Sequence, residues 1–188
     1  MKKILLFLAE GFEEVEALTV VDYLRRMDIV VDTCSITGEN KVEGAHGVIV
    51  EADKVLNELE NTKDYNGLVI PGGMPGATNL RDNEKVIQLV KEFNQDEKLI
   101  AAICAGPIVL EKAEILEGKE VTSYPGFEDE LKGIYKEDLV VQDENIITAR
   151  GPAVAVYFAL KIVEYLLGEN RVEDLKKDIL LDMVENYY

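Results

Sequence analysis

Short runs of aliphatic residues alternate along the chain with longer segments in which apolar residues recur every three or four positions. The short runs predict buried strands, and the longer segments predict amphipathic helices. The expected strands are 3–9, 29–36, 47–52, 67–73 and 98–104, and the expected helices are 13–27, 53–60, 83–95 and 106–113. Strands that alternate with helices are typical of a parallel sheet covered on both faces, so the pattern predicts an α/β fold.

The rhythm changes after residue 125. Two further runs, 138–144 and 145–150, meet at Asp143-Glu144-Asn145 and predict a β-hairpin. A helix is expected over 151–167, with Gly168 at its C-terminal end. A last helix over 171–185 is expected to dock one face on the body, ahead of a loosely held Tyr187-Tyr188 end; its apolar residues are Val172, Leu175, Ile179 and Met183.

Composition narrows the class of protein. The length of 188 residues and an apolar content of 47% favour one globular domain, 1–188. The net charge of −17 argues against nucleic acid and anionic membranes as partners, because these bind clustered Lys and Arg. No apolar run has the length of a membrane span, and the first run lacks a signal-peptide cleavage site, so a cytoplasmic location is expected.

The cysteines and the single histidine indicate neither a disulfide framework nor a metal site. Cys34 and Cys104 are far apart, with no CxxC spacing, and His46 is the one histidine of the chain. We therefore expect no metal and no other cofactor.

Candidate chemistry gathers where predicted strands end, because reactive groups of open parallel sheets lie outside the carboxyl ends of the strands. Four such stretches are chemically distinctive: residues 10–16, 71–76, 104–107 and 150–152. In a doubly wound sheet the first three could share one crevice.

Cys104 lies where a strand turns into a helix. Small Ala105 and Gly106 permit a close turn, and Pro107 suits the first helical position. The helix N-terminus is expected to lower the pKa of the thiol and to favour the thiolate. A cysteine after an apolar run is otherwise a small core residue, but this turn favours a nucleophile or redox sensor. Cys34, inside a strand, is expected to be inert.

The glycine-rich stretch and the acidic stretch each allow two interpretations. PGGMPG matches no nucleotide-binding motif, and its backbone N–H groups either form an oxyanion pocket or belong to a plain tight turn. His46 has no evident reason to reach Cys104, which leaves a carboxylate among Glu13, Glu14 and Glu16 as the proton carrier. Most of these acids would complement a helix dipole, and one beside the thiolate would keep its proton, because adjacent anions raise one pKa. Spacing does not choose among the three.

The motifs EGFEEVEA, VIPGGMPGATNL, AAICAGP and TARGP, in this order and over roughly residues 3–168, resemble those of the ThiJ/PfpI superfamily. AAICAGP is most similar to the branch that contains the parkinsonism-associated protein deglycase. The resemblance implies a flavodoxin-like α/β sandwich with a mostly parallel sheet and helices on both faces. It also implies a homodimer, with the reactive cysteine on a strained elbow.

The resemblance also assigns site residues. It implies that Cys104 is the reactive cysteine and Glu16 its protonated partner. The surrounding positions it implies are Gly72, Gly73, Ala105, Arg150, Gly151 and Pro152. Two departures matter: Ala105 stands where the peptidase-like branch has histidine, and Tyr124 stands where close relatives often have a pocket histidine. Tyrosine is a poor base at neutral pH, so catalysis that needs that histidine would be impaired.

Three functions follow in order of preference. The first is a cofactor-free glyoxalase or deglycase that acts on α-oxoaldehydes or glycated proteins, through a Cys104 hemithioacetal and a Glu16 proton shuttle. The second is an oxidative-stress sensor or chaperone that signals by sulfinate formation on Cys104. The third is a thiol peptidase or amidase whose base is His46 or comes from a partner subunit. Helix 13–27 offers either a dimer face or an ordinary core face, through Val20, Val21, Leu24, Arg25 and Arg26.

Overall fold

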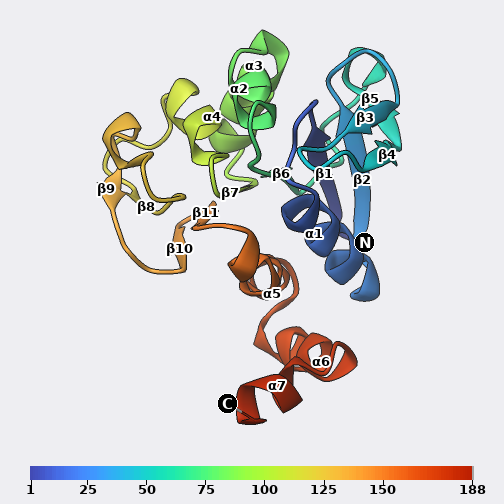
Figure 1. The fold of residues 1–188 in the computed structure, drawn as a ribbon, viewed down its shortest axis with the longest axis vertical. Helices are drawn as coiled ribbons and strands as arrows, with labels where there is room; N and C mark the ends of the chain where they lie inside the picture. The colour runs from blue at the N-terminus through green and yellow to red at the C-terminus, as the bar shows by residue number, and fades with distance from the viewer. Residues whose placement is uncertain (188) are drawn as a thin grey trace.

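The computed structural model describes residues 1–187. Its centre is a seven-stranded sheet in the order β10-β11-β7-β6-β1-β2-β5 (Figure 1). Every neighbouring pair is parallel except β10 and β11, which form the predicted antiparallel hairpin. The strands are β1 (Lys3–Leu8), β2 (Val30–Ser35), β5 (Lys54–Val55), β6 (Gly67–Ile70), β7 (Leu99–Ile103), β10 (Val140–Asp143) and β11 (Ile146–Ala149).

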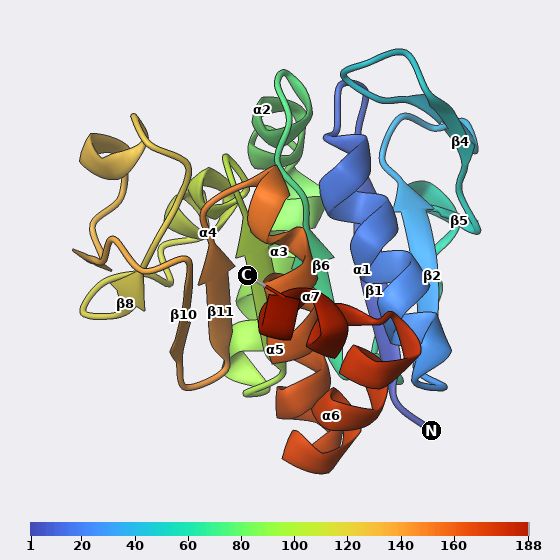
Figure 2. The ribbon, with the colours of Figure 1, turned by 60° about the horizontal axis from the view of Figure 1, so that its bottom comes forward.

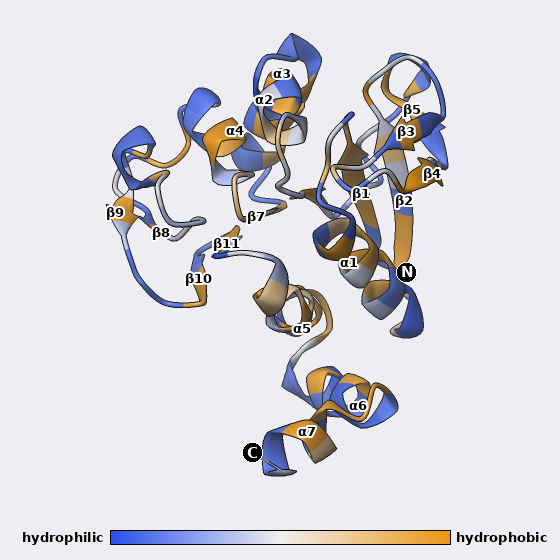
Figure 3. Ribbon diagram, viewed as in Figure 1, coloured by the Kyte–Doolittle hydropathy of each residue, from blue (hydrophilic) through white to orange (hydrophobic). Residues whose placement is uncertain are grey.

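Helices cover both faces of this sheet, so the predicted flavodoxin-like α/β arrangement is confirmed (Figure 2). On one face lie α1 (Glu14–Arg26), α5 (Ala155–Leu167) and α6 (Glu169–Asp178), followed by α7 (Leu181–Tyr187). On the other face lie α2 (Gly76–Arg81), α3 (Glu84–Gln95) and α4 (Pro107–Lys112). Strands and the inner helix faces are apolar, whereas the periphery is polar (Figure 3).

The helix α1 packs against the sheet through its apolar residues. Val20, Val21 and Leu24 are buried against the core on the α5 side of the sheet. Arg25 pairs with Asp53, and Arg26 pairs with Asp22 and Asp178. The core-facing interpretation of this helix is therefore confirmed for its apolar residues.

Two predictions for residues 47–60 are wrong. The run 47–52 is not a strand of the central sheet: β3 (Lys41–Glu43) and β4 (Ile49–Glu51) form a separate antiparallel hairpin whose outer side chains are exposed. The segment 53–60 is not an α-helix but β5 followed by a 3₁₀ turn, Leu56–Glu58. Tertiary hydrogen bonds override the helical pattern, because Asp53 is tied to the backbone and hydroxyl of Thr33.

The C-terminal region also departs from the pattern. The segment 171–185 is two helices rather than one, because the chain turns at Leu180, whose φ is 59°. Val172 and Leu175 are buried as expected, whereas Met183 is 63% exposed and does not dock. Gly168 ends α5 with φ 89°, as predicted. Tyr187 is the last residue of α7, and Tyr188 lies outside the described residues.

The remaining elements are short and lie outside the central sheet. Two 3₁₀ turns span Glu128–Glu130 and Pro152–Val154, and the latter replaces the first turn of the helix predicted over 151–167. A small parallel pair consists of β8 (Glu120–Val121) and β9 (Ile134–Tyr135). Within residues 1–187, no helix combines the length and the hydropathy that a membrane crossing requires.

Candidate active site

Cys104 lies on a sharp turn between β7 and α4. Its φ of 63° places a residue with a side chain in the left-handed region, which is strained. The Cys104 N–H donates to the Ala149 carbonyl at 2.9 Å, and the Tyr124 N–H donates to the Cys104 carbonyl at 3.0 Å. A Cβ on Gly106 would lie 2.7 Å from the Ile70 carbonyl oxygen, so the close turn needs glycine there. The neighbouring strands therefore hold the thiol on a rigid elbow.

Glu16 reaches this elbow from the first turn of α1. Its side chain is fully buried, and Oε2 accepts the Gly72 N–H at 2.8 Å. Oε1 is buried without a hydrogen-bond partner, and the Cys104 thiol lies close enough to the same carboxyl group to affect its pKa. A Cβ on Gly72 would lie 2.6 Å from the Cys104 Cβ and 2.8 Å from Glu16 Oε2. The absence of a side chain at Gly72 is what lets thiol and carboxyl meet.

Burial raises the pKa of Glu16 to about 7, and the charge of Glu13 adds to this rise. The Gly72 N–H and the Cys104 thiol act in the opposite direction, since both favour the carboxylate. The direction agrees with the prediction that one acid keeps its proton in part. The main cause differs, because burial rather than a neighbouring anion dominates.

The prediction of a lowered thiol pKa is wrong. Burial and the negative charge of Glu16 raise the pKa of Cys104 to about 12, although the backbone N–H groups of Ala105 and Gly73 act to lower it. A six-residue helix contributes a weak dipole, whereas the carboxylate is a full charge in contact with the sulfur. A thiolate at this site therefore forms most easily when Glu16 holds the proton.

The glycine-rich loop packs against both of these groups. Gly73 has φ 86°, and a Cβ there would lie 2.3 Å from the Glu13 nitrogen. The Glu13 N–H donates to the Gly72 carbonyl at 3.0 Å, which ties the loop to the start of α1. The loop is thus a tight turn, and it also directs the Gly73 N–H, together with that of buried Ala105, toward the Cys104 sulfur.

The other predicted pocket residues divide into two groups. The Tyr124 ring is 48% exposed and lies beside Gly151, where a Cβ would be 3.2 Å from the ring. Both are thus brought to the elbow through the Tyr124–Cys104 backbone bond. Arg150 instead binds backbone carbonyls, donating from N and Nη1 to Leu139 and Glu137. Exposed Pro152 begins a 3₁₀ turn.

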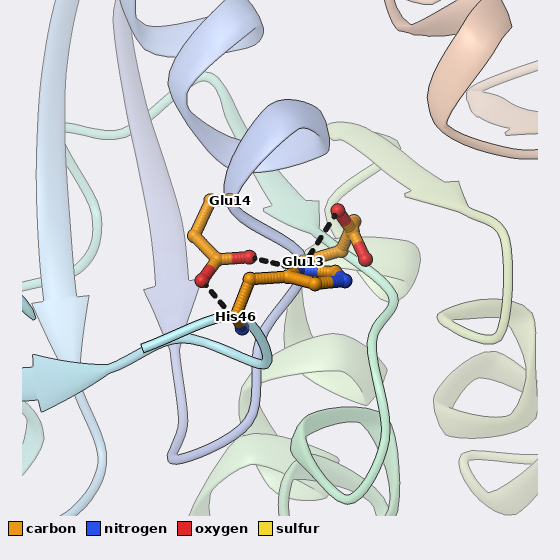
Figure 4. A group of neighbouring side chains, drawn as sticks. All are labelled: Glu13, Glu14 and His46. Atoms are coloured by element: carbon orange, nitrogen blue, oxygen red, sulfur yellow. Dashed lines mark hydrogen bonds and ion pairs between the residues drawn. The ribbon is translucent and has the colours of Figure 1, made fainter. Parts of the chain in front are cut away.

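Sequence reasoning missed the partner of His46. The Glu14 carboxylate accepts the His46 backbone N–H at 2.7 Å and contacts its Nδ1 at 2.9 Å, while Glu13 Oε1 lies 3.6 Å from Nδ1 (Figure 4). Gly44 allows this approach, since a Cβ there would collide with Glu14. No periodic signal links positions 32 apart in sequence. In residues 1–187, His46 pairs with these acids and not with Cys104, which removes the in-chain base of a thiol peptidase.

Glu13, Glu14 and His46 are also the one group of three or more potential metal ligands in the described chain, with their ligand atoms within 4.8 Å of one another. Both Glu14 oxygens already accept hydrogen bonds, from His46 and from the Val48 N–H. The pKa of Glu14 is lowered to about 2, since these bonds outweigh its burial. The trio is therefore a hydrogen-bonded ion cluster that holds the β3–β4 hairpin against α1.

Cys34 behaves as predicted. It is fully buried in β2, and burial raises its pKa to about 12. The charge of Lys85 acts to lower this pKa but does not offset the burial, so the thiol stays protonated at neutral pH.

Comparison with known proteins gives one consistent result. The profile of the DJ-1/PfpI family matches residues 2–165. The chain is 36% identical over 184 residues to the Parkinson disease protein 7 homolog of Danio rerio, covering 96% of this chain and 97% of that protein. It is 37% identical over 183 residues to Protein dj-1beta of Drosophila melanogaster, with the same coverage.

Solved structures agree with these sequence matches. The oxidized DJ-1 of Toxoplasma gondii superposes with a TM-score of 0.92 at 36% identity, covering 96% of this chain and 98% of that chain. The crystal structure of Drosophila melanogaster DJ-1beta gives a TM-score of 0.90 at 36% identity, covering 95% and 97%. The matched family region contains both Glu16 and Cys104. The chain therefore belongs to the DJ-1/PfpI family.

Proposed function

We propose that this chain is a cysteine-dependent, cofactor-free enzyme of the glyoxalase or deglycase type, acting on α-oxoaldehydes or on their early adducts with proteins. One observation carries the proposal: the buried Glu16 carboxyl lies beside the Cys104 thiol, both packed against Gly72, and has a pKa of about 7. A carboxyl group that titrates near neutral pH can both accept and return a proton during one turnover. Family membership supports the same general assignment.

The first step forms a carbon–sulfur bond. The Cys104 thiol adds to the aldehyde carbon of the substrate, its proton passes by way of Glu16 to the former carbonyl oxygen, and a hemithioacetal results. The N–H groups of Gly73 and Ala105, which face the sulfur, are placed to stabilise negative charge that develops next to it. No external acid is needed, because the pair supplies the proton.

The second step moves hydrogen between adjacent carbons. Ionised Glu16 removes the proton from the sulfur-bearing carbon to give an enediol, and the protonated carboxyl group returns it to the neighbouring carbon. The product is a thioester of a 2-hydroxy acid. Water then cleaves the carbon–sulfur bond, releases the hydroxy acid and restores the thiol. Substrate carbons are oxidised and reduced by equal amounts, so no external oxidant or reductant takes part.

Lactate formation from methylglyoxal, without glutathione and after chelator treatment, tests this function. Cys104→Ser and Glu16→Gln should each abolish turnover, because each removes one partner of the pair. Cys34→Ser is the matched control and should retain turnover, since Cys34 is buried in β2 away from the elbow. Absence of lactate from the unmodified chain with reduced Cys104 would contradict the proposal.

A second function, a redox sensor or stress-responsive chaperone, is favoured by a separate observation. The similar Toxoplasma gondii protein is described as oxidized DJ-1. Cys104 is half-buried rather than sealed, and a protonated Glu16 could donate to a sulfinate oxygen. Peroxide treatment followed by intact mass and peptide mapping tests this. Oxidation confined to Cys34, or none, would exclude the sensor.

We also propose that the chain forms a homodimer in the cytoplasm and acts on a small aldehyde or a glycated protein. Exposed apolar residues support an interface near the site: Val15 and Leu18 on α1, and Val48 and Ile49 in the hairpin that Glu14 binds. Analytical ultracentrifugation of the chain and of Leu18→Glu tests the dimer. A monomeric chain at micromolar concentration would contradict it.

A further inference from the structure

His46 closes a connection between the β3–β4 hairpin and the first turn of α1. His46 makes two contacts with Glu14. The hairpin is also tied to the loop between β1 and α1, because the Gly11 N–H donates to the Glu43 carbonyl at 2.8 Å. The Ala45 N–H also donates to the Phe12 carbonyl at 2.8 Å. These bonds hold the imidazole at a fixed place beside the helix turn that carries Glu16.

Negative charge is concentrated at this turn. Glu13, Glu14 and Glu16 follow one another within four positions, and Glu10 accepts the Glu43 N–H on the other side of the hairpin. In residues 1–187, Glu13 and Glu14 form ion pairs with His46 and with no lysine or arginine. His46 is therefore the cationic partner available to these acids.

The charge of Glu13 acts on the reactive pair. It is one of the causes that raise the pKa of Glu16, and the Glu13 N–H donates to the carbonyl of Gly72, which contacts both Glu16 and Cys104. A positive imidazolium 3.6 Å from the Glu13 carboxylate opposes this effect. The contacts with Glu14 and Glu13 raise the pKa of His46 above its usual value and so favour the charged imidazolium.

We propose that His46 is a positioning residue for the reactive pair: held by Glu14 and facing Glu13, it supplies the positive charge that sets the pH at which Cys104 and Glu16 lose the first of their two protons. This is regulation of the site described under the proposed function. The kinetic consequence rests on that function, whereas the proton loss does not. His46 contacts neither the thiol nor the Glu16 carboxyl through any hydrogen bond of the described structure.

The sign of the effect follows from electrostatics. Loss of a positive charge near Glu16 makes the first proton of the pair harder to remove, whichever of the two groups carries the remaining proton. Replacing His46 with Gln should therefore move the pH dependence of thiol reactivity upward, by about half a pH unit for one charge acting across an intervening carboxylate near the surface. His46→Arg keeps the charge and should leave the transition at or below its original pH. Glu13→Gln removes a like charge and should move it downward.

The test is the rate of Cys104 alkylation by iodoacetamide between pH 5.5 and 9, in a Cys34→Ser background so that one thiol reacts. Lys176→Gln is the matched control, since it also removes one positive charge, but from the Lys176–Glu185 pair of the C-terminal helices. We expect an upward shift for His46→Gln, restoration by His46→Arg, a downward shift for Glu13→Gln and no shift for the control.

Several outcomes would overturn the proposal. Equal shifts for His46→Gln and His46→Arg would mean that imidazole packing and not charge is responsible. An equal shift for Lys176→Gln would mean that only net charge counts. If His46→Gln fails to fold, Glu13→Gln provides the second measurement: removing the carboxylate that His46 faces should shift the transition downward, and no shift would refute the idea. Because alkylation needs no substrate, failure of methylglyoxal turnover would leave this test intact.

Discussion

Replacing Glu16 with Gln should stabilise the folded chain at alkaline pH while it abolishes the proposed reaction. The substitution keeps the shape of the side chain, and the amide oxygen can still accept the Gly72 N–H. It removes the negative charge that Glu16 otherwise carries in a fully buried position. Burying a charged carboxylate costs free energy, so a carboxylate kept for function is expected to lower the stability of the folded protein.

The magnitude follows from the proton affinity. A rise of the pKa from 4.5 to about 7 corresponds to about 3 kcal/mol, since each tenfold change is worth about 1.4 kcal/mol. The folded state binds this proton more tightly than the unfolded chain. The free energy of unfolding therefore falls as the pH rises from 4.5 to about 7 and is level above that range. The Gln variant lacks this dependence.

Urea denaturation at pH 5.5 and pH 8.5 measures the difference, with both values above the isoelectric point of about 4.4. Integrating the linkage between these pH values predicts that the stability of the variant relative to the unmodified chain increases by about 2 kcal/mol. The total advantage at pH 8.5 should reach about 3 kcal/mol. The m-value should not change, because the fold does not.

Two results would refute this reasoning. A Gln variant that is less stable than the original chain at pH 8.5 would mean that Glu16 makes stabilising interactions that outweigh its burial. A difference in stability that does not change with pH would mean that Glu16 does not titrate near neutral pH. In the second case the proposed proton shuttle would lose its physical basis.

Three further predictions concern the surroundings of the pair. Gly72→Ala should cost about 1–3 kcal/mol in urea denaturation and slow Cys104 alkylation, because the new Cβ would lie 2.6 Å from the Cys104 Cβ; unchanged values would contradict the crowding. Glu14→Gln should destabilise the chain by about 2 kcal/mol at pH 7, because it removes the buried charge to which His46 is hydrogen-bonded. A variant more stable than the original chain would refute this. Tyr124→His should raise methylglyoxal turnover at pH 7 at least about tenfold, because it places a base in the pocket where tyrosine is a poor one. An unchanged rate would mean that Tyr124 does not limit turnover.

The spacing of apolar residues correctly predicted the strands that are buried along their whole length and the helix that has one buried face. The strands 67–70 and 99–103 are apolar at nearly every position, as central parallel strands must be, and helix 84–95 has one clear apolar face. The segment 47–60 failed because its strands are short, half-exposed and at the periphery, where a few hydrogen bonds to Asp53 decide the structure. The break at Leu180 also had no signal in the apolar spacing.

For the site, the sequence by itself determined the elbow: the apolar strand, the small residues 105 and 106, and Pro107 already place Cys104 on a strand-to-helix turn. Only the tertiary structure decided that Glu16 and not Glu13 or Glu14 meets the thiol, that His46 belongs to Glu14, and that the thiol pKa rises instead of falling. The reason is physical. Helical spacing gives each glutamate a direction but not a neighbour, whereas burial, charge and contact depend on segments as distant in sequence as residues 16 and 104, which converge at the carboxyl edge of one sheet.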